Sequence, residues 1–403
     1  MTATDDDPER AFRRLPGCLP RYGVSSLGLR HLWRNLRMPV RRRRWDRENR
    51  AATAPYVKAA RPDRAGVALA AGDFSGLMGL SRAAVYEAER LRAEHGRLEL
   101  LDIRDFPRDG AAPALRHGPQ VGTLYLLAAP NTYPVLLRAL PPERIARAHR
   151  VGLWVWETPR FPEDWRFALD LVHEVWTPTE FSRRALDRAD PEVPVRVRPH
   201  PVSPPPEIAP LDRAALGVAP DAFLGLAAMD LRSCPARKNP WAHVAAWQRA
   251  FGDDPSAVLI LKLSTSKRTG VVRRELASMI GGAGNIRLMD RQLTAAEMAG
   301  LQQGADVFLS LHRAEGYGLN IHESLLLGTP VVATDWSGST EFARGFPHYH
   351  GVPCRMVPYR DWTRHYPEGG FHWAEADIAA AAETLCRLRA AAAAPAPALA
   401  RPA

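Results

Sequence analysis

Cysteines, lysines and long apolar runs are scarce in this sequence, and each scarcity excludes a class of protein. No run of about 18 apolar residues occurs, so no membrane-spanning helix is expected. The four cysteines are scattered without a C-x-x-C pair, which indicates a reduced cytosolic protein without a zinc knuckle. The opening residues Met-Thr-Ala-Thr-Asp-Asp-Asp hold no apolar signal-peptide core, so the sequence predicts a cytoplasmic protein rather than an exported one.

Only four of the 54 basic residues are lysines, namely Lys58, Lys238, Lys262 and Lys267. In a sequence so rich in arginine, a lysine is present either by chance or because its position requires a compact ammonium group. The 403 residues are 46% hydrophobic and 24% charged. This is a soluble composition and, at typical domain sizes, it indicates about two domains.

The net charge of +10 is concentrated near the N-terminus. Residues 1–64 carry 16 basic and 7 acidic residues, a net +9, whereas the remaining residues carry 38 and 37, a net +1. We therefore treat residues 1–64 as a basic arm attached to a nearly neutral body. Its last part, residues 51–64, is expected to be a linker.

Within the arm, residues 25–38 have the pattern of an amphipathic helix. Its apolar positions are Leu29, Leu32, Trp33 and Leu36, and its basic positions are Arg30, Arg34, Arg37 and the following Arg41–Arg44. An apolar stripe beside a basic face can lie in the headgroup layer of an anionic membrane. It can equally pack on the protein's own first domain, and the sequence leaves both alternatives open.

From Gly66 onward the sequence alternates between strands and helices. Strands are expected at 66–71, 98–103, 123–129, 151–156, 174–177 and 193–198, and again at 223–229, 257–263, 286–289, 307–311 and 331–334. The proline-rich segment 198–207 can continue neither a helix nor a central strand, so we interpret it as an interdomain linker. This order predicts two doubly wound α/β domains sharing a ligand cleft at the carboxyl ends of their strands.

The predicted domains follow from these boundaries. The basic arm is 1–64, a first Rossmann-like domain 65–200, a second one 201–375, a final helix 376–392 and a disordered tail 393–403. The final helix can pack back on the first domain.

The strongest motif runs from His312 to Glu323, with the sequence H-R-A-E-G-Y-G-L-N-I-H-E. Glu315 lies in a glycine-rich turn after a strand, and Glu323 lies early in the following helix. Gly316 and Gly318 let backbone N–H groups approach a ligand, and a helix N-terminus favours a diphosphate. Two carboxylates beside such a turn can accept hydrogen bonds from sugar hydroxyls. The alternative is a capped helix with solvated glutamates.

Two cationic segments follow other strands of the second domain. Arg232, Arg237 and Lys238 crowd the strand-to-helix loop at 230–240, where they can clamp the phosphates of a nucleotide diphosphate. Lys262 ends an otherwise apolar strand, either because it is solvated there or because it belongs to the same site.

These segments together resemble the family 4 retaining glycosyltransferases of the GT-B fold. The resemblance covers about residues 66–390 and includes the E-x7-E motif, its continuation at 328–341, the R-K-N-P of 237–240, and the segments 152–159 and 174–181. It implies two Rossmann-like domains facing across a cleft. It also implies transfer of a hexosyl group from a nucleotide-diphosphate sugar to a sugar or lipid-linked acceptor, in surface polysaccharide or glycolipid assembly.

The resemblance implies roles for individual residues. Lys238, with either Arg232 or Arg237, would hold the donor diphosphate. Glu315 would contact the transferred sugar, and Glu323 would bind the donor ribose. The further donor-binding positions are Gly316, Tyr317, Gly318, Leu319, Lys262, Gly76, Gly79 and His312, with Arg313 flanking the cleft beside His312.

The acceptor side departs from the family. Many members place a histidine after the fourth first-domain strand, where residues 129–133 here read A-P-N-T-Y. Asn131 can orient an acceptor, and Glu157 is the nearest ionisable candidate, with capping of the following turn as its alternative role. Three tryptophans, Trp154, Trp156 and Trp176, are expected to be core residues more readily than sugar platforms.

No D-x-D motif lies in a suitable place, so neither a metal nor another cofactor is expected, and the cationic cluster would take the metal's role. Two other functions are alternatives. A nucleic-acid-binding protein fits the arginine-rich arm but not the neutral body, and a catalytically silent partner subunit does not fit the intact Glu315, Lys238 and Glu323. The expected partners are a nucleotide sugar, a carbohydrate or lipid-linked acceptor, and an anionic membrane surface reached by the arm, with a cytoplasmic or peripheral inner-membrane location.

Overall fold

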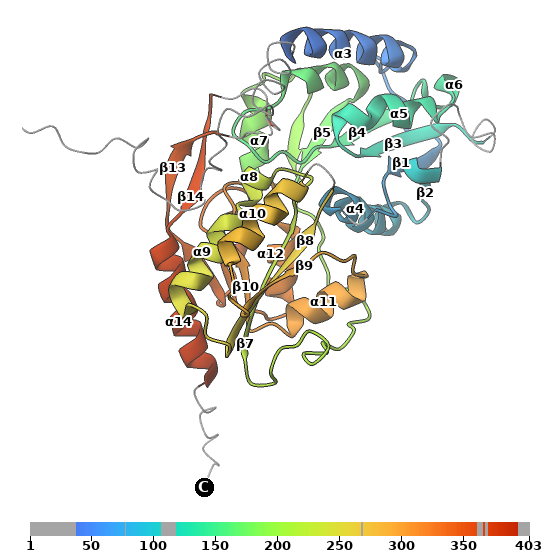
Figure 1. Ribbon diagram of the computed structural model, residues 1–403. Helices are drawn as coiled ribbons and strands as arrows, with labels where there is room; N and C mark the ends of the chain where they lie inside the picture. Colours follow the sequence, from blue (N-terminus) through green and yellow to red (C-terminus); the bar gives the residue numbers. More distant parts are fainter. Residues whose placement is uncertain are drawn as a thin grey trace, which may run out of the picture.

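A computed structural model describes residues 38–76, 78–105, 118–266, 269–360, 366 and 370–393. Residues 25–37 of the predicted amphipathic segment 25–38 and residues 394–403 of the tail lie outside these described residues, and so does Lys267. The chain forms two α/β domains, one above the other in Figure 1, with a hairpin of two strands at their side.

The first domain is built on a parallel sheet with the strand order β2-β1-β3-β4-β5-β6. Its strands are β1 (Val67–Gly72), β2 (Glu99–Asp102), β3 (Val121–Leu127), β4 (His149–Leu153), β5 (Glu174–Thr177) and β6 (Val195–Val197). Every residue of β3 and β4 is buried. Burial on both faces is typical of a parallel strand that helices cover from two sides, and it explains the nearly continuous apolar runs.

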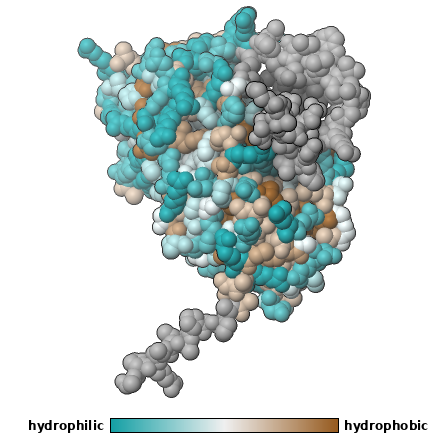
Figure 2. Space-filling model, turned by 90° about the vertical axis from the view of Figure 1, so that its left-hand side faces the viewer, coloured by the Kyte–Doolittle hydropathy of each residue, from teal (hydrophilic) through white to brown (hydrophobic). Residues whose placement is uncertain are grey.

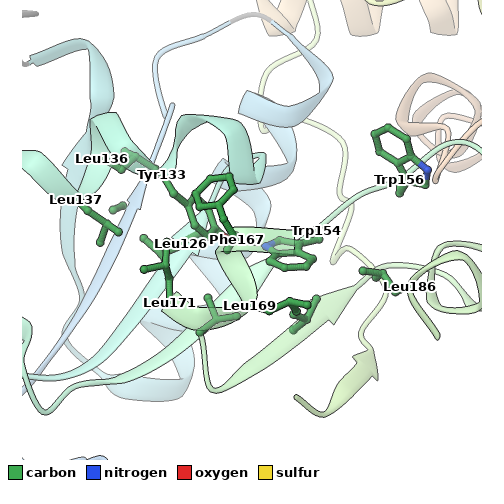
Figure 3. Close-up of a cluster of buried hydrophobic side chains, with 14 of the residues drawn as sticks. Leu126, Tyr133, Leu136, Leu137, Trp154, Trp156, Phe167, Leu169, Leu171 and Leu186 are labelled. Atoms are coloured by element: carbon green, nitrogen blue, oxygen red, sulfur yellow. Dashed lines mark hydrogen bonds between the residues drawn. The ribbon is translucent and has the colours of Figure 1, made fainter. Parts of the chain in front are cut away.

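Helices cover this sheet on both faces. The α-helices are α3 (Met38–Thr53), α4 (Gly79–His95), α5 (Tyr133–Arg138), α6 (Pro142–Ile145) and α7 (Glu180–Asp187), and the 3-10 helices are η1 (Ala54–Tyr56), η2 (Ile103–Asp105), η4 (Pro130–Thr132) and η5 (Glu163–Leu171). Figure 3 shows the core between β3, α5 and η5, where Leu126, Trp154 and Phe167 belong to one buried cluster. The Trp154 indole donates to the hydroxyl of Tyr133 at 2.7 Å, so burial of this large ring leaves its one donor satisfied.

The second domain repeats the plan with the strand order β12-β11-β10-β7-β8-β9. Its strands are β7 (Phe223–Asp230), β8 (Ala257–Ser264), β9 (Ile286–Met289), β10 (Val307–Ser310), β11 (Val331–Thr334) and β12 (Tyr349–Val352), and its helices are α8 (Pro235–Lys238), α9 (Pro240–Phe251), α10 (Gly270–Ile280), α11 (Ala295–Gln303), α12 (Leu319–Leu326) and α13 (Thr340–Ala343). The chain leaves β7 in one direction along the sheet and returns to its other side at β10. That reversal is the switch point at which doubly wound sheets bind ligands.

An antiparallel hairpin that the sequence patterns did not reveal connects the domains. It consists of β13 (Cys354–Pro358) and β14 (His372–Ala376). Although the hairpin follows the second sheet in the chain, Val357 and Trp373 belong to the core of the first domain, and Trp373 is only 1% exposed. The hairpin thereby fixes one side of the interdomain boundary.

The final helix, α14 (Ile378–Ala393), does not pack back on the first domain. It packs on α9 and against β11 and β12, and its Ala381 and Leu385 join the second core. The physical reason is that the small residues of α14 fit closely on α9, while the hairpin before it already spans the boundary. Figure 2 views the molecule from this side, where hydrophobic residues gather over the lower domain and most of the coloured surface of the upper one is hydrophilic.

The expected linker at 51–64 begins instead with packed structure. The helix α3 continues to Thr53, and Tyr56 of η1 is buried in the first core. Lys58 donates to the carbonyl oxygens of Leu169 and Val172, both at 2.7 Å, and so caps the end of η5. One of the four lysines therefore has a structural role that a compact ammonium with several donors suits well.

Candidate active site

The sequence-predicted residues converge on one cleft of about 700 Å³ between the two domains. Its second-domain wall includes the loops that follow β7 and β10, the two neighbouring strands at the switch point, and the segments that follow β8 and β9. Its first-domain wall is the N-terminal half of α4 and the segment after β4. Parallel strands end at the same edge of a sheet, which is why motifs 80 or so residues apart in the sequence meet here.

Glu315 is the centre of a charged cluster in this cleft. Its carboxylate accepts a hydrogen bond from Lys238 Nζ, and its other oxygen lies 2.9 Å from Arg237 Nη1. Burial alone would raise the pKa of Glu315, but the charges of Lys238 and Arg237 outweigh it and lower the pKa to about 2. The same guanidinium lies 3.5 Å from Oε1 of Glu157, so Arg237 bridges carboxylates that come from the two domains.

The local fold explains why both cations reach Glu315. The α8 turn carries them on adjacent positions, and Asn239 follows it with a left-handed φ of 52°. That conformation lets the chain reverse directly into α9. Burial lowers the pKa of Lys238, the neighbouring Arg237 lowers it further, and Glu315 opposes both effects.

Arg232 lies apart from this cluster although it lines the cleft. Its side chain is exposed and forms a forked pair with the carboxylate of Asp230, with Nη2 to Oδ2 at 2.8 Å. The sequence left Arg232 and Arg237 as alternatives, and the structure brings only Arg237 to Glu315.

The glycine turn before α12 passes close to the first domain. A Cβ on Gly316 would lie 2.8 Å from Val155 and 2.9 Å from the carbonyl oxygen of Trp156. Gly318 has a φ of +98°, a conformation that costs an L-residue about 1–2 kcal/mol. The two glycines thus allow the close approach and the turn that direct the N-terminus of α12 into the cleft.

Glu323 is held by residues that the sequence analysis missed. Arg82 and Tyr86, one turn apart on α4, both donate to its carboxylate, at 2.6 and 3.0 Å. Their spacing of four residues after the first-domain glycine loop is the only signal in the sequence, and it does not reveal a partner 240 or so positions away.

Two histidines of the cleft are neutral. Burial lowers the pKa of His312 to about 3 and that of His243 to about 4. His243 accepts from the N–H of Leu311 at 3.0 Å and faces the carbonyl oxygen of Asn239 at 2.9 Å, so it pins the end of β10. His312 lies 3.1 Å from the hydroxyl of Ser339 through Nε2, and its Nδ1 is buried without a hydrogen-bond partner among the described residues.

The remaining predicted residues divide into two groups. Those that line the cleft are Gly76, Gly79, Lys262, Tyr317 and Leu319. Burial lowers the pKa of Lys262, whose Nζ lies 3.2 Å from the hydroxyl of Ser264.

Other candidates are placed elsewhere. Asn131 is exposed in η4 and is not part of the cleft lining. Arg313 points away from the cleft and is paired with Glu375 of β14 at 2.6 Å. Trp154, Trp156 and Trp176 are all buried in the first-domain cores, as the core interpretation of these rings predicted.

Two negative observations concern the described residues. In that part of the chain, no three His, Cys, Asp or Glu side chains are grouped so that they could hold a metal ion. No helix there is long and apolar enough to cross a membrane.

Comparison with known proteins finds a family match within the second domain. Residues 264–388, which include both glutamates of the E-x7-E motif, match the model of the family described as glycosyl transferases group 1. No curated protein sequence matches the chain. This segment of the second domain is therefore similar to group 1 glycosyltransferases.

Solved structures share the fold at low sequence identity. Anabaena HepE in complex with UDP and glucose is 17% identical with a TM-score of 0.54, and the match covers 81% of this chain and 94% of HepE. HepE in complex with UDP-glucose gives 18% identity and a TM-score of 0.52. S. aureus TarM is 14% identical with a TM-score of 0.47, and the chain spans only 48% of its length. The likeness to HepE shows a GT-B architecture, as the sequence predicted.

Proposed function

We propose that this protein is a retaining glycosyltransferase of family 4, which moves a hexosyl group from a nucleotide-diphosphate sugar to a carbohydrate or lipid-linked acceptor. The observation that carries the proposal is the single cleft in which Arg237, Lys238 and Glu315 meet the N-terminus of α12. Two further findings support it. The group 1 match covers both glutamates, and HepE, which shares the fold, was solved with UDP-glucose.

The cationic side of the cleft suits a departing diphosphate. Glycosyl transfer builds negative charge on the leaving group, and preorganised cations stabilise that charge most strongly where water is excluded. Arg237 is 2% exposed and the Lys238 side chain 20%. In this proposal both cations attract Glu315 and the diphosphate at the same time, while the N–H groups at the start of α12 face the phosphates.

The carboxylates suit the sugar and its acceptor. Glu315, held ionised by its two cations, can accept hydrogen bonds from hydroxyls of the transferred sugar. Glu157 lies on the first-domain side of the same cluster, so we assign the acceptor hydroxyl to it. Retention of configuration then follows from attack of the acceptor on the same face that the diphosphate leaves, with no covalent intermediate on a carboxylate.

The test begins with a thermal-shift screen of nucleotide sugars that differ in base and hexose. The donor that raises Tm is then incubated with candidate acceptors, and NMR reports the anomeric configuration of the product with and without EDTA. We expect a retained configuration and activity that survives the chelator. An inverted product, or activity lost with EDTA and restored by magnesium, would refute the proposal, as would a screen in which no nucleotide sugar binds.

The proposed biological setting is surface polysaccharide or glycolipid assembly on the cytoplasmic side of a membrane. The arginine-rich arm supports this setting, since it would bring the cleft near a lipid-linked acceptor.

A further inference from the structure

The first domain contacts Glu323 through two side chains of α4. Arg82 Nη1 donates to Oε2 of Glu323 at 2.6 Å, and the Tyr86 hydroxyl donates to Oε1 at 3.0 Å. A second nitrogen of Arg82 donates to Oδ1 of Asn320 at 2.7 Å. Three hydrogen bonds therefore connect one turn of α4 with the first turns of α12 across the cleft.

These contacts occupy the carboxylate that the donor needs. The Glu323 side chain is only 7% exposed and that of Arg82 28%, so the pair is shielded from water and stronger than a surface ion pair. Both carboxylate oxygens of Glu323 already accept a hydrogen bond from the first domain. All four residues line the cleft, so a nucleotide entering it meets this contact directly.

The first-domain contact also leaves one group unsatisfied. The Nε atom of Arg82 is buried and has no hydrogen-bond partner among the described residues. An unpaired buried donor costs free energy. An exchange of hydrogen-bond partners can therefore relieve the cost of this unpaired donor. The Arg313–Glu375 pair differs, because both Nε and Nη2 of its arginine are bonded.

We propose that Arg82 and Tyr86 form a latch that the ribose of the donor displaces. In the empty cleft the carboxylate of Glu323 is bound to Arg82 and Tyr86, and in the donor complex it accepts hydrogen bonds from the two ribose hydroxyls instead. Entry of the donor then breaks the contact between α4 and α12. When this contact forms again after transfer, it helps to expel the nucleoside diphosphate. This inference rests on the proposed function, because it takes Glu323 as the ribose site.

The latch makes Arg82 a competitor of the donor rather than a donor ligand. Removing its charge in an Arg82→Gln variant should tighten UDP binding about tenfold, since the ribose no longer has to displace a charge-assisted pair. Arg82→Lys restores a cation and should return the affinity toward the wild-type value. Arg92→Gln is the matched control, because Arg92 is exposed on the same helix and outside the cleft lining.

A double-substitution cycle shows whether Arg82 acts through Glu323. UDP binding is measured by calorimetry for the wild type, Arg82→Gln, Glu323→Gln and the double variant. We expect Glu323→Gln to weaken UDP binding and Arg82→Gln to have no further effect in that background. Weaker UDP binding by Arg82→Gln in both backgrounds would overturn the latch and make Arg82 a direct ligand of the diphosphate. Unchanged binding in both would overturn it as well.

The same four proteins without nucleotide separate this inference from the proposed function. If the latch exists, the fall in Tm of the double variant is smaller than the sum of the two single falls by about 2 °C or more. If the falls in Tm are additive, the latch is overturned, whichever nucleotide the protein binds. If the falls in Tm are less than additive but the protein binds none of UDP, GDP, ADP and TDP, the proposed function is contradicted, and with it the exchange with ribose. The contact would then be a purely structural clamp between the domains.

Discussion

Individual residues in the cleft are matched in charge before any ligand arrives. Arg237 and Lys238 offset Glu315 and the nearby Glu157, so the empty cleft avoids the cost of a buried unpaired charge. A diphosphate brings new negative charge to this cluster and finds cations already oriented. The residues that perform the proposed chemistry are also the residues whose ionisation affects stability, and both effects can be measured.

The first prediction concerns Glu315 and acid stability. Its pKa falls from 4.5 to about 2 in the folded protein. The ionised form therefore contributes stability at pH values above about 4.5, and this contribution is lost as the pH falls toward 2. Glu315→Gln should remove that part of the pH dependence, so its Tm should fall less steeply than that of the wild type between pH 4.5 and 2. Glu383→Gln, an exposed position on α14, should keep the wild-type slope. Parallel curves for all three proteins would contradict the assignment.

The second prediction concerns Lys238 and turnover. With the donor found by the thermal-shift screen, Lys238→Met should lower kcat by about 10²–10³-fold, as loss of one preorganised transition-state contact does. It should change the Kd of the donor far less, because the charge on the leaving group grows only in the transition state.

Lys58→Met is a suitable control for that variant. Lys58 binds carbonyl oxygens at the end of η5, so this substitution should lower Tm and leave kcat close to the wild-type value. Equal losses of kcat in the two variants would mean that Lys238 has no special role in the reaction.

At the scale of elements, the strands were predictable because their apolar runs are local. The patterns found β5, β9 and β11 with the correct bounds and β7, β8 and β10 to within a residue. Most residues of these strands other than β9 are buried, which gives them their apolar runs. The glycine turn before α12 was equally visible, because Gly318 needs a left-handed φ. The hairpin β13–β14 was not predicted. Its Trp373 packs on the first domain, and the local hydrophobic periodicity of the sequence does not indicate a partner in another domain.

The third prediction tests the turn at the start of α12. Gly318→Ala should lower the free energy of unfolding by about 1–2 kcal/mol, because an L-residue is strained at a φ of +98°. Gly282→Ala is the control, since Gly282 does not have a positive φ and a Cβ there meets nothing within 4 Å. Urea unfolding measures both, and a Gly318→Ala variant no less stable than Gly282→Ala would be inconsistent with the turn.

At the scale of the whole molecule, the contacts across the cleft were the hardest to foresee. The motifs predicted Glu323 as a ligand residue, yet Arg82 and Tyr86 lie far from it in the sequence and belong to another domain. Sequence patterns record which face of an element is buried, and they do not record which distant side chain will cover a charged group. Asn131, predicted near the acceptor from the family resemblance, is exposed in η4 outside the cleft lining, and no local pattern in the sequence indicates that placement.

The uneven charge of the molecule leads to the last prediction. The helix α3 packs on the first domain through buried Asn49 and Thr53, while Arg43, Arg44 and Arg47 are exposed. Each arginine close to an anionic leaflet contributes about 1 kcal/mol, and salt screens that attraction. The full-length protein should therefore co-sediment with vesicles that contain phosphatidylserine and be released as the salt concentration rises.

Replacement of these three arginines of α3 by glutamine should weaken that binding without unfolding the helix, because none of the three packs on the domain. Replacement of Arg249, Arg273 and Arg274, which are exposed in the second domain, is the matched control for net charge alone. If the control loses as much vesicle binding as the α3 variant, the attraction reflects total charge and not the arm. If the wild type binds no anionic vesicles at low salt, the arm has no membrane role, and the proposed setting beside a lipid-linked acceptor loses its support.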